Sequence, residues 1–136
     1  MGCPTGVLLG DSLQFSIAVH NPETGGKSDA DSVPVYRVYD NSDIDVVVHS
    51  GTMSKINSST LTGFYIAELS CSSTNGFIDS AGYTICIEAA VDSIIGGITY
   101  GFAVYEKIEI AIGVPITIQG YDAVTGQSVM ISGRYK

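Results

Sequence analysis

The clearest pattern along the chain is a strict alternation of apolar and polar residues. Leu13, Phe15, Ile17 and Val19 occupy every second position, and polar or small residues lie between them. This period of two predicts a half-buried β-strand. Shorter runs with strand-like composition, most of them followed by Gly, Asn or Asp, cover residues 7–9, 33–40, 44–50, 52–56, 61–70, 83–91 and 98–104. Seven or eight short strands at this spacing predict an all-β chain folded as a two-sheet sandwich.

The segments between these runs carry the residues that favour turns. Residues 21–32 contain nearly every turn-forming residue type and are expected to form an exposed loop. Residues 72–82 are expected to form a corner with one helical turn. The pair Gly96-Gly97 predicts a tight hairpin leading into a strand that starts at Ile98.

Two sets of residues follow from this interpretation. The sandwich core is expected to contain the apolar residues on one parity of the strongest strands: Phe15, Ile17, Phe64, Ile85, Ile87, Phe102 and Val104. Tyr83 follows Gly82 at the start of a strand, where an immunoglobulin-like sandwich places its tyrosine corner. In that arrangement the Tyr83 hydroxyl bonds to the backbone a few residues upstream. The alternative is an ordinary half-buried tyrosine.

The last third of the chain extends the alternation beyond any plausible sandwich. Residues 98–118 alternate throughout, with Glu106 as the only charge on the apolar parity, and one extended strand of that length would measure about 70 Å. The chain is therefore expected to divide into a sandwich, residues 1–106, and a C-terminal β-arm or hairpin, residues 107–136. A two-stranded ribbon with an apolar face is marginal alone in water, so the arm is predicted to mediate assembly. The predicted interface comprises Ile108, Ile110, Ile112, Val114, Ile116, Ile118, Val129 and Ile131. The alternative is that the arm folds back over its own sandwich.

The net charge and the cysteine content indicate which partners and which cellular compartment to expect. The 136 residues carry a net charge of −8, which disfavours nucleic acid and anionic membrane surfaces as partners. No apolar stretch is long enough to span a bilayer. The three cysteines are an odd number without metal-type spacing. Reduced thiols in a cytoplasm are expected, although Cys71 and Cys86 could meet across strands.

Candidate chemistry is sparse. His20 and His49 are the only histidines, each beside a loop, and no nucleophile motif accompanies them. The chain is therefore predicted not to be an enzyme and to need no cofactor or metal. One metal alternative stays open, because two acidic loops could supply oxygen ligands to calcium. Their residues, which also suit solvated turns, are Asp29, Asp31, Asp40, Asp43 and Asp45.

A series of short motifs carries a family resemblance. They are His20-Asn21-Pro22-Glu23-Thr24-Gly25, Asp29-Ala30-Asp31-Ser32, Pro34 with Tyr36-Arg37-Val38-Tyr39, Gly51-Thr52-Met53, Thr62-Gly63-Phe64-Tyr65 and Gly82-Tyr83-Thr84-Ile85. Their order and spacing over residues 6–105 resemble a small immunoglobulin-like domain of virion proteins from tailed bacteriophages. The arm lies outside this resemblance.

The resemblance implies a non-enzymatic structural protein of the virion, made in the host cytoplasm. Because the chain is short, the resemblance favours a capsid decoration (cement) protein that binds the head surface and stabilises it. The implied partners are the major capsid protein or another virion protein, and further copies of the chain in a homo-oligomer. The alternatives are an accessory protein of the tail or neck, and a module that binds carbohydrate or a host surface.

Overall fold

The computed structural model describes residues 2–57, 59–106, 115–118 and 129–134, and the last two ranges only as backbone. Their strands are β1 (Gly6–Leu8), β2 (Ser12–Ala18), β3 (Val35–Asp40), β4 (Asp43–Thr52), β5 (Ser54–Lys55), β6 (Phe64–Ser70), β7 (Ala81–Val91), β8 (Ile94–Tyr105), β9 (Pro115–Ile118) and β10 (Val129–Arg134). One 3₁₀ helix, η1 (Ser73–Asn75), lies in the predicted corner between β6 and β7. The described chain is all-β, as the alternation predicts.

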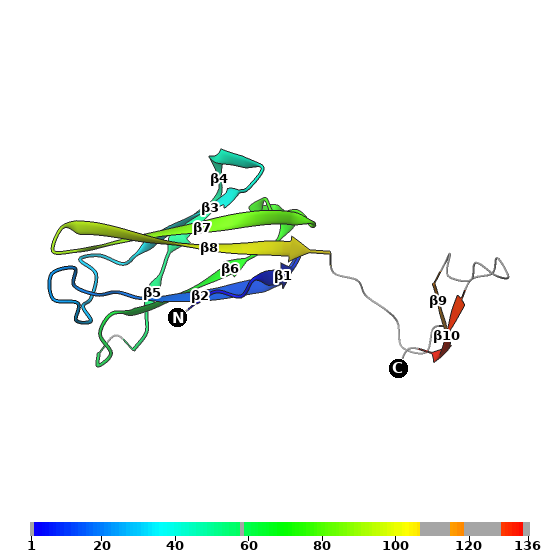
Figure 1. Ribbon diagram of the computed structural model, residues 1–136, viewed down its shortest axis with the longest axis horizontal. Helices are drawn as coiled ribbons and strands as arrows, with labels where there is room; N and C mark the ends of the chain where they lie inside the picture. The colour runs from blue at the N-terminus through cyan, green and yellow to red at the C-terminus, as the bar shows by residue number, and fades with distance from the viewer. Residues whose placement is uncertain (1, 58, 107–114, 119–128, 135–136) are drawn as a thin grey trace.

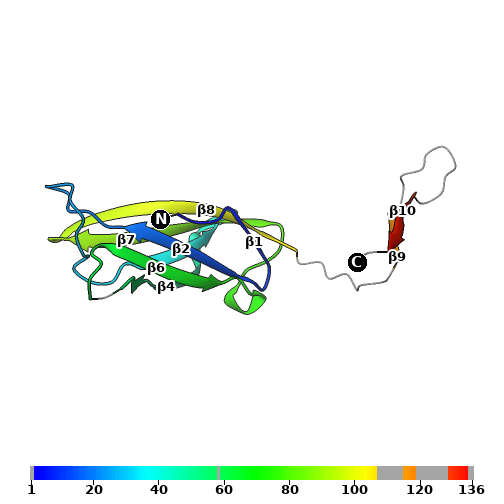
Figure 2. The same cartoon turned by 90° about the horizontal axis from the view of Figure 1, so that it is seen from below.

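Two sheets form the body of the molecule. One has five strands in the order β1-β8-β7-β3-β4, and the other has three in the order β2-β6-β5. Neighbouring strands are antiparallel except β1, which runs parallel to β8. The sheets lie as two layers, with β2 and β6 across from β7 and β8 (Figures 1 and 2). The predicted β-sandwich is confirmed, and its eight strands match the predicted number.

The core fills the space between the two layers. It contains six of the seven predicted residues, namely Phe15, Ile17, Ile85, Ile87, Phe102 and Val104, all of which are buried. Burial of such apolar side chains is the main favourable contribution to folding. Three aromatic rings pack together in this core. The ring centroids of Phe77 and Tyr83 lie 4.9 Å apart in an edge-on contact, and those of Tyr83 and Phe102 lie 5.6 Å apart in a stacked one.

The prediction for Phe64 is wrong. In β6 the buried residues are Tyr65, Ala67 and Leu69, so Phe64 lies on the opposite face of the strand and is only partly buried. Its ring is covered from outside by Lys27, whose Nζ lies 4.2 Å from the ring centroid. Apolar residues occur on both parities of this strand, and the parity that carries the charge of Glu68 is the one that faces outward.

The predicted hairpin at Gly96-Gly97 is also wrong. β7 and β8 pair from Val91↔Ile94 onward, so the turn is Asp92-Ser93, and both glycines lie inside β8 opposite Ala89 and Glu88. Asp92 and Ser93 have φ values of 50° and 67°, the left-handed conformation that a two-residue hairpin turn requires. The strand therefore starts at Ile94 rather than Ile98.

The backbone bond expected of Tyr83 is present. Its hydroxyl oxygen accepts a hydrogen bond of 2.9 Å from the N–H of Ile78, five residues upstream in the corner. The ring itself is fully buried. Burial raises the pKa of the Tyr83 hydroxyl. This bond ties the crossover from β6 to the start of β7.

The C-terminal region contributes a third, two-stranded sheet. β9 and β10 pair antiparallel with each other, with Ile118 opposite Val129 and Thr117 opposite Met130. The register shifts between Met130 and Arg134, which marks a bulge or irregularity. Neither strand belongs to the two sandwich sheets. β9 and β10 are the described part of the predicted C-terminal arm, residues 107–136.

Candidate interaction surface

A rigid hairpin tip forms one end of the five-stranded sheet. The carboxylate of Asp31 accepts hydrogen bonds from the N–H groups of both turn residues, Asp92 at 3.0 Å and Ser93 at 2.9 Å. The Asp31 N–H donates to Ala90 O at 2.7 Å, and Asn21 Nδ2 donates to the Asp92 carboxylate at 3.1 Å. A loop distant in sequence therefore holds the left-handed turn in place and offsets the strain of that conformation.

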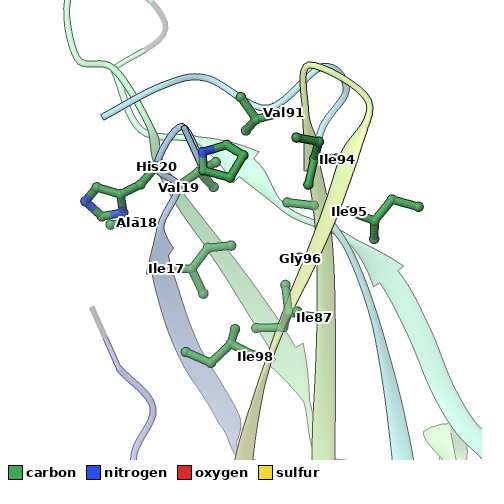
Figure 3. Close-up of a pocket in the computed structure, with 13 residues that line it drawn as sticks. Ile17, Ala18, Val19, His20, Ile87, Val91, Ile94, Ile95, Gly96 and Ile98 are labelled. Atoms are coloured by element: carbon green, nitrogen blue, oxygen red, sulfur yellow. The ribbon is translucent and has the colours of Figure 1, made fainter. Parts of the chain in front are cut away.

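An apolar groove opens beside this hairpin, between the two sheets. It has a volume of about 380 Å³. Its lining comes from the end of β2 and from the hairpin: Ile17, Ala18, Val19, His20, Pro22, Ile87, Ala89, Val91, Ile94, Ile95, Gly96, Gly97 and Ile98. Figure 3 shows Ile17 and Ile98 directed into the space between the strands, whereas Ile95 points away.

The groove exists because β8 lacks a neighbour along most of one edge. Among the described residues, β1 pairs with β8 only from Ala103 to Tyr105, and β7 pairs with the other edge from Ile94 to Val104. On the opposite sheet, Gly2 bridges β2 only at Ser16. Ile94 and Ile98 are left 46% and 43% exposed, and Ile95, which points away from the groove (Figure 3), is 69% exposed. Contiguous exposed apolar surface of this kind commonly marks a site of protein–protein contact.

A second exposed apolar patch lies on β4, the outer strand at the other side of the five-stranded sheet. Ile44, Val46 and Val47 are exposed there. The pairing of β4 with β3 is interrupted by register shifts on both sides of Tyr39, a feature common at sheet edges. Sequence reasoning missed both patches. The available signal was the adjacent apolar pairs Ile94-Ile95 and Val46-Val47, because neighbouring strand residues point to opposite faces.

Of the five acidic residues in the two loops, Asp29, Asp31 and Asp40 bind other groups of the fold, and Asp43 and Asp45 are exposed in β4. Asp29 binds Lys55 Nζ at 2.7 Å and accepts from the Gly63 N–H at 2.8 Å. These two bonds hold the pKa of Asp29 below its usual value, and the bond to Lys55 has the larger effect. Asp40 accepts from the N–H and hydroxyl of Ser42, which lowers its pKa. In the part of the chain that the structure describes, no three His, Cys, Asp or Glu side chains form a metal-type group. The calcium alternative therefore gains no support from the geometry.

The cysteines and histidines are likewise dispersed. Cys71 is fully buried in the core, whereas Cys86 lies between the buried residues Ile85 and Ile87 and so points to the outer face of its sheet. The two thiols are on opposite sides of a strand layer and cannot meet, and both are free. His49 packs beside Tyr36 and Phe77 with ring centroids 6.4 and 6.5 Å away. His20 is exposed at the groove.

The predicted assembly residues fall into two groups. Ile108, Ile110, Ile112 and Val114 lie outside the described residues. Ile116 and Ile118 lie in β9, and Val129 and Ile131 lie in β10, so the structure brings these four into one two-stranded sheet. Whether this sheet mediates assembly stays a prediction.

Comparison with protein-family models, with curated proteins and with solved structures found no match for this chain. No helix in the described part of the chain is long and apolar enough to cross a membrane.

Proposed function

We propose that this chain is a non-enzymatic structural protein of a bacteriophage virion, and specifically a decoration protein that binds the head surface and stabilises it. Its partners are the major capsid protein and further copies of the chain. The observation that carries the proposal is the exposed apolar surface at two separate sites of a small sandwich, the hairpin groove and the β4 patch. A small acidic domain with such surfaces suits protein–protein contact better than contact with nucleic acid.

The strand order supports an immunoglobulin-like identity for the sandwich. In that fold the strands B, E and D lie side by side in one sheet, while G, F, C and C′ lie in the other. Assigning β2 to B, β3 to C, β4 to C′, β5 to D, β6 to E, β7 to F and β8 to G reproduces this division. Tyr83 then stands near the start of strand F, with its hydroxyl bonded upstream, as the tyrosine corner requires.

The groove is poorly suited to bind carbohydrate, which would be the ligand if the chain were a carbohydrate-binding module. Sugar recognition needs convergent hydrogen-bonding groups, and His20 contributes the one ionisable side chain of the groove lining. The remaining lining residues are aliphatic or glycine. An apolar strand or another protein surface satisfies such a lining better.

Quantitative mass spectrometry of purified virions tests the proposal. Virions should come from the phage that encodes the chain, after a density gradient and a high-salt wash that removes loosely bound protein. The expected result is a copy number close to that of the major capsid protein, or a simple fraction of it. A few copies per particle would favour the neck or tail, and absence from the particle would overturn the proposal. Heads prepared without the chain should gain thermal stability when the purified protein is added.

A further inference from the structure

We propose that the groove between β2 and β8 receives residues 108–114 of a second copy of this chain, added to the free edge of β8 as a further strand. The inference rests on the proposed role in assembly and names the surface that accepts the arm. Strand addition of this kind uses backbone hydrogen bonds for affinity and side-chain pockets for specificity.

The backbone of β8 has groups in place for such an addition. Ala103 N–H donates to Thr5 O at 3.0 Å, and Tyr105 O accepts from Leu9 N–H at 2.8 Å, both on the β1 side. Val104 O accepts from Ser80 N–H at 2.8 Å, on the β7 side. Because successive residues of a strand present their backbone groups to opposite edges, Gly97, Thr99 and Gly101 direct theirs away from β7. Among the described residues, no strand pairs with this stretch.

The arm has the side chains and the length that the groove requires. Ile108, Ile110, Ile112 and Val114 occupy alternate positions, so one face of an extended segment would be entirely β-branched and apolar. Seven extended residues span about 23 Å, so residues 108–114 would pair along a stretch of β8 such as residues 95–101. The opposite parity contains Glu109, Ala111 and Gly113, none of which needs an apolar pocket. A second copy of β8 fits less well, because its inward residues Phe102 and Val104 are already buried in its own core.

The donor is expected to be another molecule because of where the arm leaves the sandwich. β8 ends at Tyr105, and there β1 occupies the same edge, paired from Ala103 to Tyr105. An arm that turned back directly along its own β8 would collide with β1. The groove lies at the opposite end of β8, beside the hairpin. An arm from a neighbouring copy reaches it without crossing β1.

Cysteine cross-linking of the full-length protein tests the proposal. In a Cys3→Ser, Cys86→Ser background, Thr99→Cys is placed on the acceptor edge and Ala111→Cys on the donor segment. Thr99 is exposed, and buried Cys71 remains in both proteins. The two single-site proteins are mixed and oxidised mildly. The expected result is a disulfide-linked dimer that contains one of each protein and forms at least tenfold faster than a dimer of either protein alone.

A matched pair of variants adds a control for nonspecific apolar association. Ile98→Asp in the acceptor groove should reduce the mixed dimer at least tenfold, whereas Ile44→Asp on the β4 patch should leave it unchanged, with both variants folded by circular dichroism. Three outcomes overturn the proposal. Only a Thr99→Cys homodimer forms, or no cross-link forms, or a chain that carries both Thr99→Cys and Ala111→Cys forms its disulfide only within one molecule. Because the assay uses the purified chain alone, its failure is distinct from failure to find the chain in virions.

Discussion

The hydrogen bond from Ile78 to Tyr83 allows a sharp test of what holds the sandwich crossover. Tyr83→Phe removes only the hydroxyl oxygen, so the ring keeps its contacts with Phe77 at 4.9 Å and Phe102 at 5.6 Å. The N–H of Ile78 then loses its acceptor at 2.9 Å in a partly buried position. A buried donor left without a partner costs about 1–3 kcal/mol, and partial access to water favours the lower part of that range.

We therefore expect Tyr83→Phe to lower the free energy of unfolding by about 1–2 kcal/mol. For a domain of this size, that corresponds to a fall in Tm of roughly 3–10 °C. Urea unfolding followed by circular dichroism measures the free energy, and calorimetry measures the Tm. Amide hydrogen exchange adds a local readout, because protection of the Ile78 amide should fall in the variant.

Tyr105→Phe provides the matched control. Tyr105 ends β8 and is 55% exposed, so removal of its hydroxyl should change the free energy of unfolding by no more than about 0.5 kcal/mol. If Tyr83→Phe is as mild as this control, and the Ile78 amide stays protected, the hydroxyl bond does not hold the crossover and the reasoning is refuted.

Three further predictions concern stability. Phe102→Ala should cost about 3–5 kcal/mol in urea unfolding, because the ring is buried against Tyr83; a nearly neutral result would show that the inward parity of β8 is misassigned. Gly63→Ala should destabilise by about 1–3 kcal/mol more than Gly25→Ala. Both glycines have positive φ, but a Cβ at Gly63 would lie 2.8 Å from Val19 O and 3.0 Å from Ser28 O, whereas a Cβ at Gly25 would meet nothing within 4 Å. Equal losses of stability in the two variants would contradict this reasoning. Burial raises the pKa of the Cys71 thiol from 9.0 to about 11. The folded state keeps this thiol neutral, so the free energy of unfolding is unaffected below pH 9 and falls by about 2–3 kcal/mol as the pH rises to 11. Urea unfolding between pH 8 and 11 should show this fall in the wild type and a smaller fall in Cys71→Ala. An equal fall in the two proteins would exclude the Cys71 thiol as its source.

The strands and most of the core could be predicted because they depend on local periodicity. In β2, apolar residues occur on one parity only, so Phe15 and Ile17 were assigned correctly. In β6, apolar residues occur on both parities, and Phe64 was placed inside although Glu68 shares its face. A pattern that is ambiguous in sequence is resolved only when the opposite sheet selects a face.

The hairpin and the groove depend on contacts between distant parts of the chain. The Asp92-Ser93 turn is held by the carboxylate of Asp31, about sixty residues earlier in the sequence. No local signal shows that Asp31 serves this turn, and Gly96-Gly97 is the stronger turn motif in the sequence alone. The free edge of β8 follows from how short β1 is, which is a property of the whole sheet.

Deletion of residues 107–136 tests the central claim, that the arm is an assembly device attached to an autonomous sandwich. The full-length and truncated proteins are compared at equal concentration by sedimentation velocity and thermal unfolding. The account predicts that the truncated protein keeps the circular dichroism and cooperative unfolding of the sandwich but loses self-association and binding to heads. A truncated protein that unfolds would show that the arm belongs to the core of its own sandwich. One that stays folded and still associates would show that assembly does not use the arm.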